Sequence, residues 1–252
     1  MIFLHGGGDN PDNRADTFGR FVEAVTVNSS CNLALVVAED TEAQAYESFD
    51  EYKNIFASLP NAPAQIHPVF VSATQPLSRA QLENIQPSGV FVCGGVAPLY
   101  HQSLCLDTSW MNYLLNEKIP YGGTSAGAAI AAQKAILGGW LATRNAETRA
   151  MLFKGASEGL DPITVQDGLG LVPFAIDVHA SQLGTLTRLI HAVELGLVTK
   201  GWAIDENTVL QFEGNEISIF GQGHAYRVWR DTQHSVHITV HVSGNIKKTW
   251  ND

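Results

Sequence analysis

The segment Gly123–Gly127, with the sequence Gly-Thr-Ser-Ala-Gly, has the residue types and spacing of a nucleophile turn between a strand and a helix. Such a turn holds its serine in a strained backbone conformation with the hydroxyl exposed. It needs small neighbours so that backbone segments can approach each other. Glycine and alanine surround Ser125 on both sides. We therefore expect Ser125 to be a catalytic nucleophile, while the short pattern taken alone also fits a glycine-rich turn with an incidental serine.

A serine hydroxyl needs a base that works near neutral pH, and histidine is the usual one. Of the nine histidines, His179 ends the apolar run 174–178 and precedes a stretch of helical spacing over 183–195, which predicts a position at a strand end. We predict that His179 is the base. No Asp or Glu occurs over 126–146, and Glu147 is the first carboxylate after the serine. We predict that Glu147 orients the histidine.

A second pair of glycines, Gly94-Gly95, closes the apolar run 89–93. In an open parallel sheet the ligand binds outside the carboxyl ends of the strands, so two glycine turns at neighbouring strand ends can meet there. The backbone N–H groups of Gly95 and Ala126 are therefore predicted to form an oxyanion hole. The competing interpretation is that the glycine pair only ends a strand.

Segments of β-strand character alternate with segments of helical spacing through the first half of the chain. The predicted strands cover 2–5, 33–37, 67–71, 89–93 and 120–124, and the predicted helices cover about 17–27, 42–59, 78–85, 99–115 and 126–137. This alternation predicts an α/β fold with a mostly parallel sheet covered on both faces. Short strands after residue 201, two of them joined by the turn Glu213-Gly214-Asn215, predict an antiparallel C-terminal extension of that sheet. We interpret residues 1–252 as one domain.

The composition disfavours several classes of function. The 252 residues carry a formal net charge of −10 with scattered basic side chains, which disfavours binding to nucleic acid or to an anionic membrane. No apolar run reaches the ~18 residues that span a bilayer, and the N-terminus lacks the pattern of a signal peptide, so we expect a cytoplasmic protein. The cysteines, Cys31, Cys93 and Cys105, and the spacing of the histidines predict neither a disulfide framework nor a metal site, and we expect no cofactor.

Further motifs follow the serine turn in a fixed order along the chain. They are Gly168–Leu171, Asp177–His179, Arg188-Leu189, Ile204–Thr208 and Gly221–Gly223. Together with Gly123–Ala128 they resemble the cyanophycinase branch of the dipeptidase E family, from the first strand to about Tyr226. The resemblance implies a three-layer α/β/α fold, similar to flavodoxin and to class I glutamine amidotransferase domains. It also implies a serine peptidase with Ser125 as nucleophile, His179 as base and a downstream carboxylate, a role that Glu147 would fill.

The substrate pocket implied by this resemblance departs from the family pattern. Val96-Ala97 stand in place of Asp-Gln, Val178 stands in place of Gln, and Leu183 and Thr185 stand in place of two arginines. Cyanophycinases cleave β-aspartyl-arginine units, whose free carboxylate needs a guanidinium partner. We therefore expect a less charged and more apolar pocket, poor activity on cyanophycin, and a small peptide or amide as substrate. The residues expected to line this pocket are Val96, Ala97, Asp177, Val178, Leu183 and Arg188.

Two other functions stay open at this stage. The segment His5–Gly8 resembles the oxyanion motif of hormone-sensitive-lipase-like carboxylesterases, although it opens the chain with no strand before it. The altered pocket also fits a non-enzymatic, amidotransferase-like binding domain, although a site without chemistry has no need of a strained turn. Exposed edges of the C-terminal strands are compatible with a homodimer.

Overall fold

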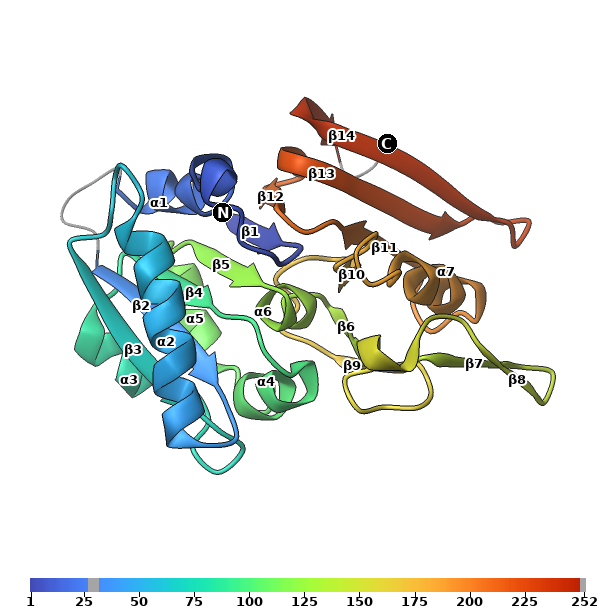
Figure 1. Cartoon of the computed structure of the whole chain (residues 1–252), viewed down its shortest axis with the longest axis horizontal. Helices are drawn as coiled ribbons and strands as arrows, with labels where there is room; N and C mark the ends of the chain where they lie inside the picture. Colours follow the sequence, from blue (N-terminus) through green and yellow to red (C-terminus); the bar gives the residue numbers. More distant parts are fainter. Residues whose placement is uncertain (27–31, 250–252) are drawn as a thin grey trace.

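Five short apolar segments form the parallel half of the central sheet in a computed structural model that describes residues 1–26 and 32–249 (Figure 1). In spatial order β1-β5-β4-β2-β3, neighbouring strands are parallel throughout. Most residues of β1, β2, β4 and β5 are buried, as expected for a parallel sheet covered on both faces. The strands are β1 (Ile2–His5), β2 (Asn32–Ala38), β3 (Gln65–Val71), β4 (Gly89–Val92) and β5 (Tyr121–Thr124).

Helices cover both faces of this half of the sheet, which confirms the predicted three-layer α/β fold. On β1, Phe3 packs into the core beneath α1 and α2, while the next residue, Leu4, packs into the core on the opposite face. None of the helices described is long and apolar enough to span a bilayer. One face carries α1 (Phe18–Val25) and α2 (Glu42–Ala57), and the other carries α3 (Arg79–Ile85), α4 (Ala97–Leu104), α5 (Ser109–Glu117) and α6 (Ala126–Ile130).

The C-terminal strands continue the same sheet, as predicted. Two of them, β11 and β12, lie end to end beside β13. The strands are β10 (Ala175–Val178), β11 (Lys200–Ile204), β12 (Thr208–Glu213), β13 (Glu216–Arg230) and β14 (Val236–Thr249). β14 follows β13 along one edge, while β12 pairs with the first part of β13 and β11 with the last part. Because β14 occupies one edge of β13, β11 and β12 share the other edge, and a short break at 205–207 separates them.

The break between β11 and β12 is where the carboxyl ends of β1 and β10 meet. β1 runs antiparallel to β12, and β10 runs parallel to β11. The carboxyl ends of β1 and β10 therefore point toward each other at the break, and the backbone N–H of His179 donates to the carbonyl of Gly6 at 2.9 Å. The helix α7 (Leu186–Glu194) packs against β10, β11 and β13.

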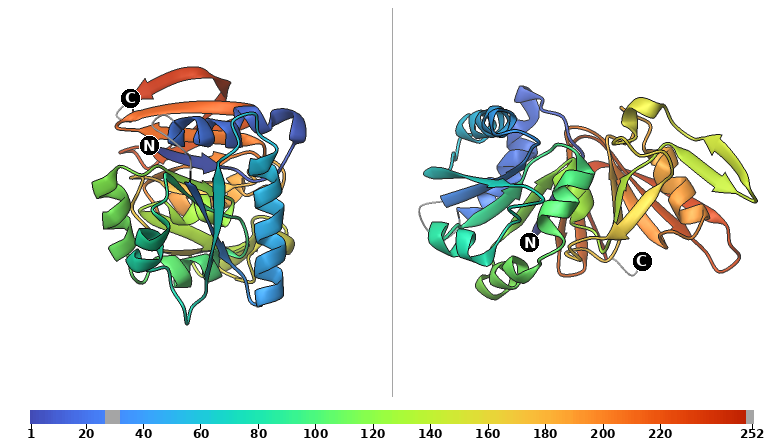
Figure 2. Two further views of the ribbon diagram at one scale, coloured as in Figure 1. Left: turned by 90° about the vertical axis from the view of Figure 1, so that its left-hand side faces the viewer. Right: turned by 90° about the horizontal axis from the view of Figure 1, so that it is seen from below.

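Residues 126–167 differ most from the sequence-based prediction. The predicted helix 126–137 ends at Ile130, and Lys134–Gly138 forms β6, which pairs with β9 (Thr164–Asp167). Alanine has the highest helix propensity, but intrinsic propensity is weak compared with tertiary contacts, and pairing with β9 overrides it here. The hairpin of β7 (Leu141–Arg144) and β8 (Glu147–Ala150) was not predicted, and it projects from the end of the molecule far from α2 (Figures 1 and 2). Two short 3₁₀ helices, Pro11–Asp16 and Lys154–Ala156, complete the secondary structure.

The predicted helix 99–115 is two helices, α4 and α5, and the N–H of Ser109 donates to the Asp107 carboxylate at 2.9 Å in the turn between them. Elsewhere the predicted capping box of Ser78 and Gln81 is present.

Cys93 is buried, as predicted, and Cys31 lies outside the described residues. The edge strand β14 exposes Ile238, Val240 and Val242, and the homodimer stays a prediction.

His5 lies buried at the carboxyl end of β1, between two aromatic rings. Its ring centroid is 4.8 Å from that of Phe18 and 5.5 Å from that of Phe91. Burial lowers the pKa of His5 to about 3, so the imidazole is neutral in the folded protein near neutral pH. Its Nε2 atom has no hydrogen-bond partner among the described residues.

This burial predicts a contribution of His5 to the pH dependence of stability. The unfolded chain binds a proton at His5 below about pH 6.5, and the folded chain does so only near pH 3, so the free energy of unfolding falls as the pH falls through that window. The contribution is about 2 kcal/mol between pH 7 and pH 5. Between pH 7 and pH 5, the free energy of unfolding measured with urea should therefore fall by about 2 kcal/mol less in His5→Leu than in wild type. Between pH 7 and pH 8 the two proteins should change alike, and equal losses down to pH 5 would contradict the prediction.

Candidate active site

Ser125 has the strained geometry that the sequence predicts for a nucleophile turn. It lies between β5 and α6 with φ 49° and ψ −114°, and its N–H donates to the carbonyl of His5 at 3.1 Å. A Cβ atom on Gly123 would lie only 2.5 Å from the carbonyl of Gly127, and one on Gly127 would overlap the carbonyl of Val92. Glycine is therefore required at both positions because backbone segments pass within van der Waals contact.

Three side chains form a continuous hydrogen-bonded chain at this turn. The Ser125 Oγ lies 2.9 Å from the Nε2 of His179. The Nδ1 of His179 lies 2.8 Å from the Oε1 of Glu206. His179 follows β10, and Glu206 lies in the break between β11 and β12. All three side chains are partly buried, which leaves the serine open to solvent on one side.

The glycines after β1 hold this chain in place. A Cβ atom on Gly7, whose φ is +97°, would overlap the imidazole of His179, and one on Gly8 would lie 2.9 Å from the Cβ of Glu206. The carbonyl of Gly7 accepts the N–H of Asn207 at 2.8 Å. The segment His5–Gly8, which resembles an esterase oxyanion motif in sequence, thus packs against the histidine and its carboxylate partner.

The structure does not place Glu147 near His179, and this prediction is wrong. Glu147 lies on the exposed hairpin β7–β8, and its carboxylate accepts a hydrogen bond from Arg149 at 2.8 Å. Glu147 was predicted because it is the first carboxylate after Ser125 along the chain. Closeness in sequence does not imply closeness in the fold, and Glu206, 81 residues after Ser125, is the carboxylate at His179. A usable signal was present, since Glu206 lies in the motif Ile204–Thr208 directly after a strand.

Asp177 and Arg188 pair with each other and are not available to a substrate. The Nε and one terminal nitrogen of Arg188 donate to the two oxygens of Asp177 at 2.8 and 2.6 Å, and its other terminal nitrogen donates to the carbonyl of Ala156 at 2.7 Å. Burial acts to lower the pKa of Arg188, and the Asp177 carboxylate more than offsets this, so the pKa is raised. The pair links α7 to β10, and neither side chain lines the cavity at Ser125, where both were predicted to bind substrate.

The other four predicted pocket residues are also absent from the lining of the cavity at Ser125. Val178 and Ala97 are buried, and the N–H of Ala97 donates to the carboxylate of Glu158 at 3.3 Å. Val96 is exposed at the start of α4, and the N–H of Leu183 donates to the carbonyl of His179 at 2.9 Å. In the described part of the chain, none of the six residues predicted to bind substrate lines the cavity at Ser125.

The cavity at Ser125 has a volume of about 370 Å³ and opens at the carboxyl ends of four parallel strands. Two of its lining residues are apolar, Phe18 and Ile55, and three are acidic. The expectation of a less charged and more apolar pocket is therefore wrong. The lining comes from Gly7–Asp9 after β1, Glu39 after β2, Gly94-Gly95 after β4, Thr124-Ser125 of β5 and the turn, His179, and Ser48, Glu51, Tyr52 and Ile55 of α2.

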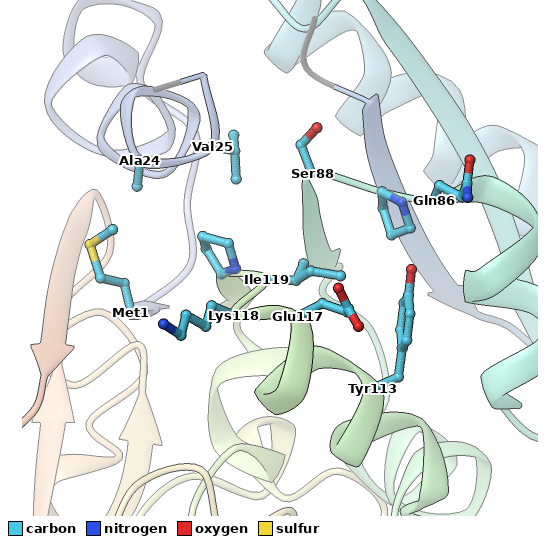
Figure 3. A pocket seen from close by; sticks show the side chains of 11 residues that line it. Met1, Ala24, Val25, Gln86, Ser88, Tyr113, Glu117, Lys118 and Ile119 are labelled. Atoms are coloured by element: carbon cyan, nitrogen blue, oxygen red, sulfur yellow. The ribbon is translucent and has the colours of Figure 1, made fainter. Parts of the chain in front are cut away.

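A larger cavity of about 550 Å³ lies at the opposite end of the sheet and lacks such chemistry (Figure 3). Met1, Ser88 and Pro120 lie directly before β1, β4 and β5, so this cavity opens at the amino ends of the parallel strands. Parallel sheets bind their ligands at the carboxyl ends, where Ser125 lies. The smaller cavity is therefore the candidate active site.

Two tyrosines fix the glycine turn after β4. The hydroxyl oxygen of Tyr52 accepts the N–H of Gly94 at 3.0 Å, and the hydroxyl of Tyr100 donates to the carbonyl of Gly94 at 3.0 Å. Burial raises the pKa of both tyrosines, so both hydroxyls keep their protons. Because the peptide bond after Gly94 is trans, the N–H of Gly95 points opposite to that carbonyl, away from Tyr100.

Among the residues described, no group of three or more histidine, cysteine or acidic side chains is placed to hold a metal ion. The hydrogen-bonded groups at the cavity are one serine, one histidine and one carboxylate, and Gly95 and Ala126 are two candidate backbone donors beside them. These are the groups that acyl transfer through a serine requires.

No protein-family model matches the chain. The structure is similar to that of a peptidase from an acI-B1 Actinobacterium, with a TM-score of 0.66 over 98% of this chain and 96% of that chain at 11% identity. It is also similar to a candidate peptidase E protein from Listeria monocytogenes EGD-e, with a TM-score of 0.54 over 88% of this chain and 98% of that chain at 16% identity. At these identities the likeness establishes a peptidase E-like α/β fold.

Proposed function

We propose that this protein is a serine-type hydrolase that cleaves small peptides or amides through an acyl-enzyme. The hydrogen-bonded chain from Ser125 through His179 to Glu206 is the observation that carries the proposal. It lies at the carboxyl ends of parallel strands, beside a cavity that could hold a short peptide. The likeness in fold to two proteins described as peptidases supports the same class of reaction.

In the proposed mechanism, the Nε2 of His179 takes the hydroxyl proton of Ser125 as the Ser125 oxygen attacks the substrate carbonyl. The N–H groups of Gly95 and Ala126 stabilise the oxyanion of the tetrahedral intermediate. His179 then gives the proton to the leaving amine as the amide bond breaks. Water, activated by His179, releases the acyl group and restores the serine. Glu206 keeps the Nδ1 proton of His179 in place and stabilises the imidazolium.

The test is phosphonylation by an alkyl fluorophosphonate, measured by intact mass. Wild type should gain one adduct, because the activated Ser125 attacks phosphorus as it would attack a carbonyl. Ser125→Ala should gain none. Glu206→Gln should react about 100-fold more slowly, since the amide no longer holds the imidazole in the required tautomer.

Glu147→Gln is the matched control and should react at the wild-type rate, because Glu147 lies on the β7–β8 hairpin. Equal rates for Glu206→Gln and wild type would exclude the proposed role of Glu206. No adduct on folded wild type would favour the non-enzymatic binding domain over the hydrolase.

The two tyrosines around Gly94 generate a second prediction. Without its hydroxyl, Tyr100→Phe leaves the Gly94 carbonyl unpaired, so the Gly95 N–H loses its fixed direction. The rate of phosphonylation should fall about tenfold, a fraction of the loss seen when an oxyanion donor is removed. Tyr113→Phe, on α5, is the control and should leave the rate unchanged. A normal rate for Tyr100→Phe would remove Gly95 from the proposed oxyanion hole.

We further propose that the chain is a divergent relative of cyanophycinases with little activity on cyanophycin. The only arginine that the sequence resemblance leaves in the pocket, Arg188, is buried against Asp177 and cannot bind the free carboxylate of a β-aspartyl unit. Release of β-aspartyl-arginine should be at least about 100-fold slower than cleavage of the best short peptide amide, a difference of about 3 kcal/mol. Comparable rates in a mass-spectrometric assay would contradict this.

A further inference from the structure

Three carboxylates line the cavity at Ser125, and only one of them is neutralised by the protein. Asp9 pairs with Arg14, whose Nε donates to Asp9 Oδ1 at 2.7 Å. Glu39 accepts a hydrogen bond from the hydroxyl of Ser48 at 2.8 Å, which leaves its charge in place. Among the described residues, neither Glu39 nor Glu51 forms an ion pair with a basic side chain. The cavity therefore carries unbalanced negative charge.

No lysine or arginine belongs to the lining of this cavity as far as the chain is described. The histidine that lines it, His179, is committed to Ser125 and Glu206. A cavity lined by one sign of charge attracts ligands of the opposite sign and repels ligands of the same sign. A substrate with a carboxylate at this position would be repelled, and one with a cation would be attracted.

The negative charge of Glu39 lies near the position where the reaction would develop negative charge on the substrate oxygen. An oxygen of Glu39 lies 3.7 Å from the point where a Cβ on Gly95 would be, so the carboxylate lies close to one proposed oxyanion donor. A negative charge there opposes the negative charge that develops on the substrate oxygen. A substrate cation bound to Glu39 would offset this repulsion.

We propose that the substrate carries a cationic group, an ammonium or a guanidinium, that binds between Glu39 and Glu51. The inference rests on the proposed hydrolase function and specifies its substrate class. Two sources supply the same chemistry: the free α-ammonium of a short peptide and the side chain of lysine or arginine. Glu39 and Glu51 are then residues that determine specificity.

The experiment measures how small amides slow the labelling of Ser125 by a neutral alkyl fluorophosphonate. Norleucinamide carries only an α-ammonium, N-acetyl-lysinamide carries only a side-chain ammonium, and N-acetyl-norleucinamide carries neither. At least one of the two cationic amides should protect Ser125 at about tenfold lower concentration than the neutral amide, and which one does so identifies the source. N-acetyl-glutamic acid α-amide should protect less than the neutral amide. Added salt should reduce these differences.

Substitutions then assign the effect to the two carboxylates. Glu39→Gln and Glu51→Gln should each weaken protection by the cationic amide severalfold, the double variant should abolish the preference, and Glu51→Lys should favour the anionic amide. Glu47→Gln is the matched control, because Glu47 is exposed one turn before Glu51 on the same helix and does not line the cavity.

Each outcome distinguishes the inference from the proposed function. Labelling of Ser125 with equal protection by cationic, neutral and anionic amides would overturn the inference and leave the hydrolase proposal standing. A preference for cations that persists in the double Gln variant would also overturn it. Failure of folded wild type to label at all would overturn the hydrolase proposal and the inference together.

Discussion

The meeting of β1 and β10 end to end, across the break between β11 and β12, is the constraint on which the site depends. β13 is long enough to carry β12 beside its first part and β11 beside its last part, so two sets of strands approach each other head to head. Ser125 comes from one set, His179 comes from the other, and Glu206 lies in the break itself. No single strand end could supply all three groups.

Close packing at this junction explains why its glycines are required. The loop after β1 passes directly against the His179 ring and the Glu206 side chain, and its backbone bonds to the segments that follow β10 and β11. The buried carboxylate of Asp205 accepts the N–H groups of Ser181 and His224 at 2.9 Å, which ties the loop after His179 to β13. The orientation of the imidazole thus follows from backbone contacts on several sides, which is how a rigid site is supported.

The fold and the site residues could be predicted from the sequence where the pattern was local. They could not be predicted where the structure depends on pairing between distant segments. The glycines around Ser125 and the apolar strand before His179 are local patterns. They identified Ser125 and His179, which lie within hydrogen-bond distance of each other in the structure. The motif around Glu206 marks it as a candidate, but its position beside His179 depends on the pairing of β11 with β10, which no local pattern reveals. The strand at Lys134–Gly138 was predicted as helix because its partner β9 is some 30 residues away. The acidic lining was missed because it comes from α2 and the loops after β1 and β2.

The order of the elements along the chain has a consequence for biosynthesis. β1 precedes every other strand described, yet its antiparallel neighbour β12 is completed only at Glu213, so a growing chain presents β1 with one unpaired edge until β12 has been made. Unpaired edges recruit other strands. The same delay means that the nascent chain contains the serine turn long before it contains Glu206. The hydrogen-bonded chain therefore cannot be complete until β12 has closed the edge of β1.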